Sequence, residues 1–410
     1  MRYYFLSTSN HIIESFTKLL TEENKKPKMA LIQSTNYTDW PMGGTLTYIN
    51  NLIPTLDKRY RMHIWGVNVQ GRPNDTAEIL GKEYKLYKYA EVVTGRKIPL
   101  NFVRVYKGMK RHAEKLTKYD IAFVHSGTEL MAIKKTLGDR APFLVFIQHG
   151  IGFLHSKVKQ DHYYYMYTSK YSVKHADLSL IVSDDDTFSK FIKRKDYHIN
   201  CPIYAVGAPI DRNLIKVRKT NELTDTVKFV YAGRFSPEKQ PEYALKAFSY
   251  YLKEYGDNAS LTYIGDGPMN DELRGMVHNM GLDEKVIFTG KVSHEALISE
   301  LKDYDIMLTP SQYEGFGLSS VEAMAAGLPV VAFDVEGLKG IIKNGVNGYL
   351  TEPFDNKGFA KGMHDAVEHF TELSKNAIET AGPYDAEVFT NRLCDIIDEN
   401  YQKYLENKNK

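Results

Sequence analysis

Residues 306–332 read IMLTPSQYEGFGLSSVEAMAAGLPVVA. The apolar run Ile306–Thr309 is a candidate strand, and the glycines around Phe316 predict a turn. Leu318–Ala326 has the composition of a helix, and Pro329–Phe333 returns to a strand. A strand, a turn, a helix and a second strand form the repeating unit of a parallel sheet covered by helices. This stretch therefore predicts an α/β fold.

The same alternation extends in both directions along the chain. With 410 residues, the chain exceeds the size at which a single core stops growing, so two domains are expected. The polar stretch Asp211–Asp225 separates two series of strands and is the expected linker. The expected domains are residues 1–210 and 211–388, followed by an amphipathic helix over Phe389–Tyr404. The expected strands are Arg2–Ser7, Met29–Ser34, Met62–Val67, Ile121–His125, Phe143–Gln148, Leu178–Val182, Ile203–Val206, Lys228–Ala232, Ser260–Ile264, Lys285–Thr289, Ile306–Thr309, Pro329–Phe333 and Gly348–Thr351.

Charge is distributed unevenly between the two halves of the chain. Residues 1–210 contain 31 Lys and Arg against 19 Asp and Glu, a net charge of 31 − 19 = +12. The remainder contains 22 basic and 32 acidic residues, a net charge of −10. A basic half could face an anionic lipid, an anionic polymer or nucleic acid, or could be an ordinary solvated surface.

The expected location is the cytoplasm. The two cysteines, Cys201 and Cys394, lie far apart and form no CxxC pair, which fits a reducing compartment. The N-terminus lacks the pattern of a secretory signal, and the longest apolar runs are too short to cross a bilayer.

Two segments of the second half predict an anion site. The backbone N–H groups of residues 316–318 lie at the start of the expected helix, where unpaired donors and the helix dipole favour an anion. The second segment follows the strand Lys228–Ala232 and carries Arg234 and Lys239, which could grip a diphosphate. Glu314 and Glu322 flank the helix start, and carboxylates there are suited to accepting hydrogen bonds from sugar hydroxyls.

The Arg–Lys pair followed by Glu-x7-Glu closely resembles the retaining glycosyltransferases of family 4, the group 1 enzymes related to glycogen synthase. Further matches are Gly43-Gly44, Gln148-His149-Gly150, Gly265-Asp266-Gly267-Pro268 and Phe288-Thr289-Gly290. The resemblance covers most of the chain. It implies a GT-B fold, in which two Rossmann-like domains face each other across a cleft. It also implies that the last helix, 389–410, crosses back to the first domain.

The resemblance assigns roles to individual residues. Arg234 and Lys239 would bind the diphosphate, and His149 would lie near the reacting carbon of the sugar. Glu314 would hold sugar hydroxyls together with the backbone of Phe316, Gly317 and Leu318, and Glu322 would hold the ribose. Gly43 and Gly44 would approach the donor phosphates, while Gly290 and Lys291 would lie beside the base.

No metal and no cofactor are expected. Asp184-Asp185-Asp186 has the DxD spacing of a different glycosyltransferase architecture, but it precedes a helix, so the run is expected to cap that helix. His149 and His155 lack the spacing of a zinc helix. Arg234, Lys239 and the helix start would supply the positive field instead.

The expected reaction is transfer of a hexose from a nucleoside-diphosphate sugar, most simply a UDP-sugar, to a glycan, polyol-phosphate or lipid-linked acceptor of a cell-surface polysaccharide. The basic stretch Lys107–Lys115 and the aromatic run His162–Tyr167 suit docking on an anionic membrane; alternatively, the tyrosines are partly buried helix residues. The alternatives are a sugar-nucleotide epimerase and a non-catalytic binding or chaperone subunit. No nucleic-acid-binding motif is present, so nucleic acid is not an expected partner.

Overall fold

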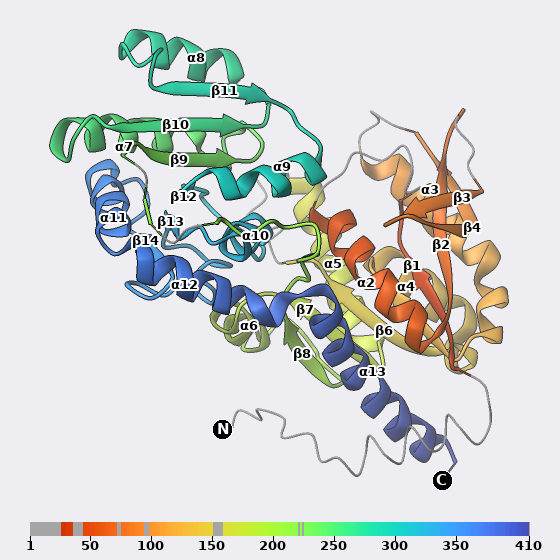
Figure 1. Ribbon diagram of the computed structural model, residues 1–410. Helices are drawn as coiled ribbons and strands as arrows, with labels where there is room; N and C mark the ends of the chain where they lie inside the picture. Colours follow the sequence, from red (N-terminus) through yellow and green to blue (C-terminus); the bar gives the residue numbers. More distant parts are fainter. Residues whose placement is uncertain are drawn as a thin grey trace.

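The computed structural model describes residues 26–35, 44–71, 75–93, 98–150, 159–219, 222–223 and 225–409. Three sequence predictions lie outside these residues: the strand Arg2–Ser7, Gly43 and His155. Hydrogen bonding between strands divides the described chain into two sheets, which Figure 1 shows side by side.

The first sheet has eight strands in the order β3-β4-β2-β1-β5-β6-β7-β8. All neighbours are parallel except β3 and β4, which form an antiparallel hairpin at the edge. The buried patterns of the central strands are continuous, as expected for a sheet covered on both faces. The strands are β1 (Lys28–Ile32), β2 (Arg61–Val69), β3 (Thr76–Ile79), β4 (Lys82–Val92), β5 (Ile121–Val124), β6 (Phe143–Gln148), β7 (Leu178–Val182) and β8 (Ile203–Val206).

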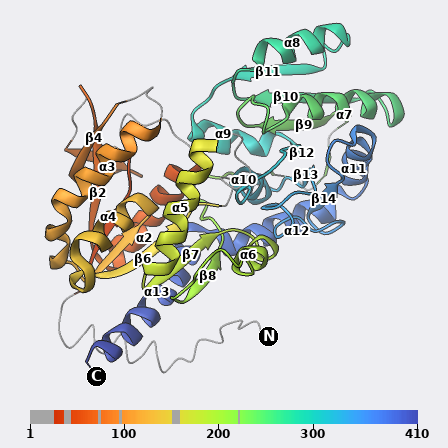
Figure 2. The ribbon, with the colours of Figure 1, turned by 180° about the vertical axis from the view of Figure 1, so that it is seen from behind.

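Helices cover both faces of this sheet. Helices α3, α4 and α5 contact one another in series, and they lie in front of the sheet in Figure 2. Helix α2 lies on the opposite face, against the C-terminal helix. The helices are α2 (Gly44–Arg59), α3 (Ile98–His112), α4 (Gly127–Leu137), α5 (Lys159–His175) and α6 (Asp185–Ile192), with short 3-10 turns at Ala113–Lys118 and Gly138–Arg140.

The second sheet has six parallel strands in the order β11-β10-β9-β12-β13-β14. Its strands are β9 (Val227–Ala232), β10 (Ala259–Ile264), β11 (Val286–Gly290), β12 (Ile306–Thr309), β13 (Val330–Phe333) and β14 (Gly348–Thr351). Its helices are α7 (Pro241–Glu254), α8 (Asn270–Asn279), α9 (His294–Glu300), α10 (Leu318–Ala326), α11 (Asn356–Glu368) and α12 (Phe370–Ala381), with a 3-10 turn at Leu301–Asp303.

The last helix, α13 (Ala386–Lys408), returns to the first domain after the 3-10 turn Gly382–Tyr384. Asp398 accepts hydrogen bonds from Arg59 Nε at 2.7 Å and from the Tyr60 hydroxyl at 2.7 Å, both at the end of α2. Tyr401 packs its ring against Phe143 of β6. Figure 1 shows α13 running from the second domain along the first. The crossing implied by the resemblance is therefore present.

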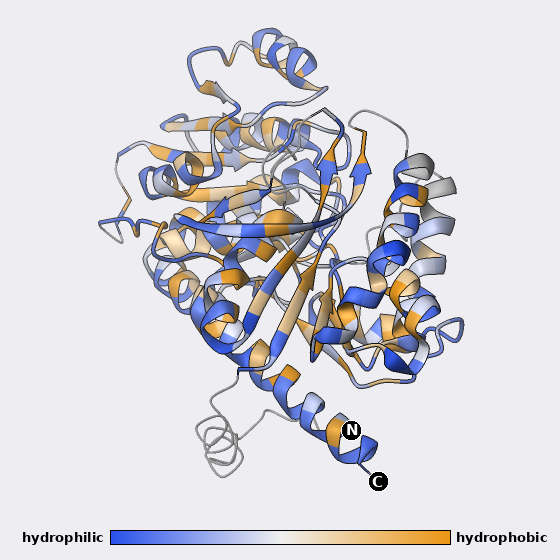
Figure 3. Ribbon diagram, turned by 90° about the vertical axis from the view of Figure 1, so that its right-hand side faces the viewer, coloured by the Kyte–Doolittle hydropathy of each residue, from blue (hydrophilic) through white to orange (hydrophobic). Residues whose placement is uncertain are grey.

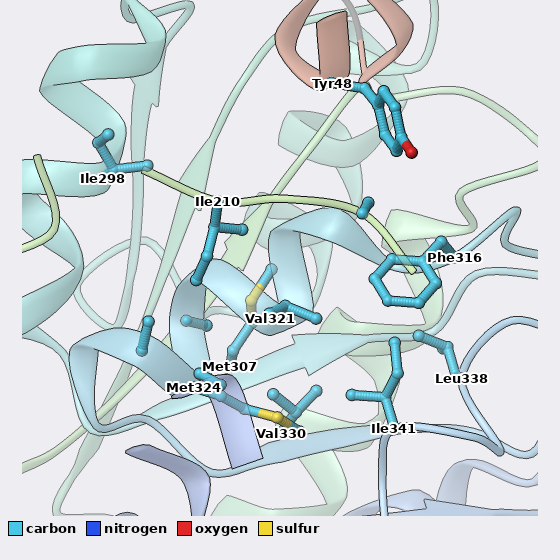
Figure 4. Close-up of a cluster of buried hydrophobic side chains, with 14 of the residues drawn as sticks. Tyr48, Ile210, Ile298, Met307, Phe316, Val321, Met324, Val330, Leu338 and Ile341 are labelled. Atoms are coloured by element: carbon cyan, nitrogen blue, oxygen red, sulfur yellow. The ribbon is translucent and has the colours of Figure 1, made fainter. Parts of the chain in front are cut away.

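The largest apolar core is continuous across both sheets. Figure 4 shows part of it, with Tyr48 of α2 above the second-domain side chains Phe316, Val321 and Met324. The strands are apolar along much of their length, whereas the outer helices mix hydrophilic and apolar residues (Figure 3). In the described part of the chain, no helix is both long enough and apolar enough to cross a membrane.

The predicted α/β fold with two Rossmann-like sheets is confirmed. β7, β8, β12 and β14 begin and end where the sequence predicts. The hairpin of β3 and β4 was not among the expected strands. The expected linker falls within residues 207–226, between β8 and β9. Cys201 and Cys394 are both free thiols.

Candidate functional site

The candidate site lies where the strand order of the second sheet reverses. From β9 the chain first adds β10 and β11 on one side, and it then returns to add β12 on the other side. Parallel α/β sheets bind ligands at such a switch point, beyond the carboxyl ends of the strands. The segment after β9 carries Arg234 and Lys239, and the segment after β12 carries Glu314. The topology therefore brings three predicted site residues together.

Lys239 and Glu314 form an ion pair in this crevice. The distance between Lys239 Nζ and Glu314 Oε1 is 2.6 Å, and their side chains are 32% and 12% exposed. The Ser311 hydroxyl donates to the same carboxylate oxygen at 2.8 Å. Arg234 is exposed, and its guanidinium forms no ion pair with another described residue. The crevice thus offers one exposed cation, one paired cation and an oriented carboxylate.

The turn between Glu314 and α10 depends on glycine. Gly317 has φ +81° and stands immediately before α10, which begins without a side-chain cap. A Cβ on Gly317 would lie 2.4 Å from Leu338 Cδ2, so a side chain is excluded as well as disfavoured by the backbone. An uncapped helix start leaves N–H groups free to bind an anion. The predicted contribution of the backbone around Leu318 is therefore structurally possible.

Glu322 lies inside α10 with a histidine as its partner. Its Oε1 atom is 2.8 Å from Nε2 of His294, the first residue of α9. Burial alone would lower the pKa of His294, but the hydrogen bond and the charge of Glu322 together raise it above its ordinary value. Glu322 is nearly buried, so this imidazole orients one of its two carboxylate oxygens.

His149 directly follows β6 and lies beside a second histidine, His125. Its Nε2 atom lies 2.9 Å from Nδ1 of His125, which follows β5, and its ring stands edge-on to Tyr48 at 4.8 Å between centroids. Burial lowers the pKa of His149 to about 4. Burial, together with the neighbouring His149, lowers the pKa of His125 well below its ordinary value. Both rings are therefore neutral at pH 7 and can exchange hydrogen bonds with hydroxyl groups.

The polar atoms next to this histidine pair have spare hydrogen-bonding capacity. His125 Nε2 and the Tyr48 hydroxyl are buried, and neither has a hydrogen-bond partner among the described residues. Burying a polar group without a partner is costly. Such atoms suit a site that a polar ligand completes.

The two domains meet at this point. Gly150 has φ +72°, and a Cβ there would lie 3.2 Å from Gly315 Cα. This contact places the backbone after His149 against the backbone after Glu314. Gly207, just after β8, lies beneath the rings of Phe316 and Tyr384. The structure therefore joins the first-domain histidine and the second-domain glutamate in one region.

The remaining predicted residues come from several elements. Gly44 is the first residue of α2, and its predecessor Gly43 is not described. Gly290 ends β11 with φ +76°, and Lys291 after it is exposed. Phe316 is buried against Tyr384, so only its backbone could serve a ligand.

Sequence reasoning missed several residues of the site. His125 could have been found, because it follows β5 as His149 follows β6, and both lie at the same edge of one sheet. Ser311 is the second residue after β12, so its position at a strand end could also have been recognised. His294 offered none, since its partner Glu322 lies 28 residues away. Asp184 caps α6 as predicted, with its Oδ1 accepting from Thr187 N at 2.8 Å.

Part of the chain is similar in sequence to known proteins. Residues 214–382 match the family model for glycosyl transferases group 1. An uncharacterized glycosyltransferase of Methanocaldococcus jannaschii is 37% identical over 150 residues, which cover 36% of this chain and 38% of that protein. The chain thus matches well under two thirds of that relative.

Two solved structures share the fold over almost the whole chain. Sucrose-phosphate synthase from Thermosynechococcus elongatus superposes with a TM-score of 0.74 at 18% identity, covering 92% of this chain and 100% of that one. Anabaena HepE, in complex with UDP and glucose, superposes with a TM-score of 0.69 at 17% identity, covering 91% and 99%. Residues 214–382 are thus similar to the group 1 glycosyltransferases, and the described chain has the two-domain GT-B fold of these two solved structures.

Proposed function

We propose that the chain transfers a hexosyl group from a UDP-sugar to a hydroxyl group of a glycan, polyol-phosphate or lipid-linked acceptor, with retention of anomeric configuration. The observation that carries the proposal is the crevice at the switch point. There, Gly315, next to the Glu314 of the Lys239–Glu314 pair, packs against Gly150, next to His149 of the first domain.

The crevice suits a nucleoside-diphosphate sugar. Arg234, Lys239 and the uncapped start of α10 face the same region and would neutralise a departing diphosphate. Because these groups supply positive charge, we propose that turnover needs no metal ion. Glu314 and the neutral His149 would then bind hydroxyls of the transferred sugar. The UDP and glucose bound by the structural relative HepE support a UDP-sugar as donor.

Retention of anomeric configuration without a covalent intermediate is proposed from the contacts of the Glu314 carboxylate. Glu314 is held by Lys239 and Ser311, an arrangement that suits binding better than covalent attack. The bond from the anomeric carbon to the phosphate oxygen would break, and the acceptor oxygen would bond to the same face. The acceptor proton would pass to the leaving phosphate oxygen. Positioning and charge stabilisation would then supply the catalysis.

The class of acceptor is proposed from the charge and the exposed aromatic residues of the first domain. Its sequence carries the net positive charge, and Tyr163, Tyr165 and Tyr167 are exposed on α5. Exposed aromatic rings beside basic residues favour an anionic surface. We therefore propose a cell-surface polysaccharide as the product and a peripheral position at the inner membrane face, where a lipid-linked acceptor would be met.

The test is a donor panel without added metal. Wild type and Glu314→Ala are incubated with UDP- and GDP-sugars, with and without membrane extract, and nucleoside diphosphate release is followed. Glu406→Ala, an exposed glutamate near the end of α13, is the matched control. Wild type and Glu406→Ala should release UDP, more so with extract, and Glu314→Ala should lose at least about 100-fold.

The other outcomes select the alternatives. Release that a chelator abolishes would contradict the metal-independent mechanism. Release with no glycosylated product, and with a new sugar isomer, would identify an epimerase. Calorimetric binding of UDP without any turnover would identify a binding subunit. Absence of both binding and release would reject the proposed function.

A further inference from the structure

Asp184, in the aspartate run 184–186, has a second partner besides its own helix. One carboxylate oxygen, Oδ1, caps α6. The other, Oδ2, accepts from the Thr187 hydroxyl at 3.0 Å and from the backbone N–H of Gly337 at 2.5 Å. Gly337 belongs to the second domain, 153 residues further along. Asp184 is almost fully buried, so this hydrogen bond across the domain interface is shielded from water.

The bond reaches the Glu314 turn through a single peptide unit. The N–H of Gly337 and the carbonyl of Glu336 belong to the same planar amide. That carbonyl accepts from the backbone N–H of Glu314 at 3.4 Å. Because the amide is planar, its N–H and C=O cannot turn independently. One rigid unit therefore connects an aspartate of the first domain to the backbone of the crevice glutamate.

The loop that contains this amide packs tightly against Glu314 on one side and against Asp184 on the other. Gly337 has φ +88°, and a Cβ there would stand 2.3 Å from the carbonyl oxygen of Glu314. A Cβ on Gly340 would stand 2.2 Å from Asp184 Cβ. Two glycines thus let the loop after β13 lie between Asp184 and the Glu314 turn. Any displacement of Asp184 must be taken up by that loop.

We propose that Asp184 is a positioning residue for the transfer reaction. It accepts from Gly337 when the domains are in contact, and the 336–337 amide passes that contact to Glu314. The inference deepens the proposed function and rests on it. Glu314 reaches its working position through this contact, so turnover depends on Asp184. Nucleotide affinity does not, since most of the groups expected to hold the nucleotide, among them Arg234, Lys239 and Glu322, belong to the second domain.

The test compares Asp184→Asn with wild type in the full-length protein. The amide oxygen can still cap α6, but the amide nitrogen replaces Oδ2 and presents a donor to the Gly337 donor. UDP release with donor and acceptor gives kcat and KM, and calorimetry gives the UDP dissociation constant. We expect kcat to fall about tenfold or more, with KM for the donor and the UDP dissociation constant within about twofold.

Two further variants keep the proposal falsifiable. Gly340→Ala forces the loop away from Asp184 from the opposite side and should reproduce the kcat loss, even if Asp184→Asn fails to fold. Asp355→Asn makes the same substitution at the cap of α11, where Asp355 accepts from Lys357 N at 3.1 Å, and should leave kcat unchanged.

Each remaining outcome overturns one of the two proposals. No turnover by wild type rejects the proposed function itself. If wild type turns over, an unchanged kcat in both Asp184→Asn and Gly340→Ala rejects the positioning role. A loss in Asp355→Asn equal to that in Asp184→Asn would show that the effect is loss of a helix cap. An equal loss of UDP affinity in Asp184→Asn would show general damage to the site.

Discussion

His294 and Glu322 make stability depend on pH at the scale of single residues. The pKa of His294 is raised above its ordinary value by Glu322, with a smaller contribution from Glu295 beside it on α9. The folded state therefore binds this proton more tightly than the unfolded state. The resulting stabilisation is fully present below pH 6.5 and is lost as the pH rises through the raised pKa.

We expect His294→Gln to destabilise the protein more at pH 5.5 than at pH 8.5, because glutamine keeps a donor but never carries the charge. Thermal unfolding midpoints of both proteins at both pH values measure the difference. His278→Gln is the matched control, since its pairing with Asp283 is exposed and long, at 3.4 Å. A pH-independent difference for His294→Gln would contradict the charged pair.

The sequence predicted those candidate site residues that directly follow a recognisable strand. Arg234 and Lys239 follow one strand, and Glu314 follows another, so the rule for switch points predicts that they share one edge of the sheet. His294 could not be found in this way, because its partner Glu322 comes from another element, whereas His125 follows β5 and was overlooked. A side chain-to-side chain contact between distant segments leaves no local periodicity to detect.

At the scale of elements, α13 is attached to α2 by one buried cluster and one exposed pair. Asp398 is 5% exposed and is bound by Arg59 and Tyr60. We expect Asp398→Ala to lower the free energy of unfolding by about 2–4 kcal/mol, because Arg59 and Tyr60 lose their buried carboxylate and keep only Asp395 and the Cys394 carbonyl as acceptors. The midpoint of urea unfolding measures this change.

Glu387→Ala provides the comparison on the same helix. Glu387 pairs with Lys58 at 2.8 Å, but both side chains are more than 60% exposed. This substitution should cost no more than about 1 kcal/mol. Equal costs for the two variants would show that the buried cluster does not dominate the attachment of α13.

Element positions were largely predictable, and the exception is instructive. The central strands are buried on both faces and appear as continuous apolar runs. The edge strand β3 alternates exposed and buried residues, and its neighbour β4 is exposed or half-buried along most of its length and rich in charged residues. Lysine and glutamate, which are expected at a sheet edge, interrupt the apolar alternation that identifies a strand. The segment therefore resembles a polar loop in sequence.

At the scale of the whole molecule, packing between the domains shapes the crevice. A Cβ on Gly207 would lie 2.6 Å from Tyr384 Cε1 and 3.0 Å from Phe316 Cζ. We expect Gly207→Ala to shift Phe316 and the turn that carries Glu314, and to lower kcat/KM for transfer about 10- to 100-fold. Steady-state UDP release measures this effect.

Gly275→Ala is the corresponding control. Gly275 lies in α8, and a Cβ there meets no atom within 4 Å. Alanine should leave kcat/KM unchanged and raise the free energy of unfolding by up to about 1 kcal/mol, because glycine is a poor helix former. Unchanged activity in Gly207→Ala would mean that the turn tolerates movement at the interface.

The sequence by itself determined the α/β fold, the positions of most strands along the chain, and the strands that Arg234, Lys239, Glu314 and His149 follow. These features follow from local periodicity and from glycines that permit specific turns. Only the tertiary structure decided the pairing of Glu322 with His294, the contact of Gly150 with Gly315 and the bond from Asp184 to Gly337. Each joins segments that are distant in the chain, and their proximity depends on how two sheets and a returning helix pack together.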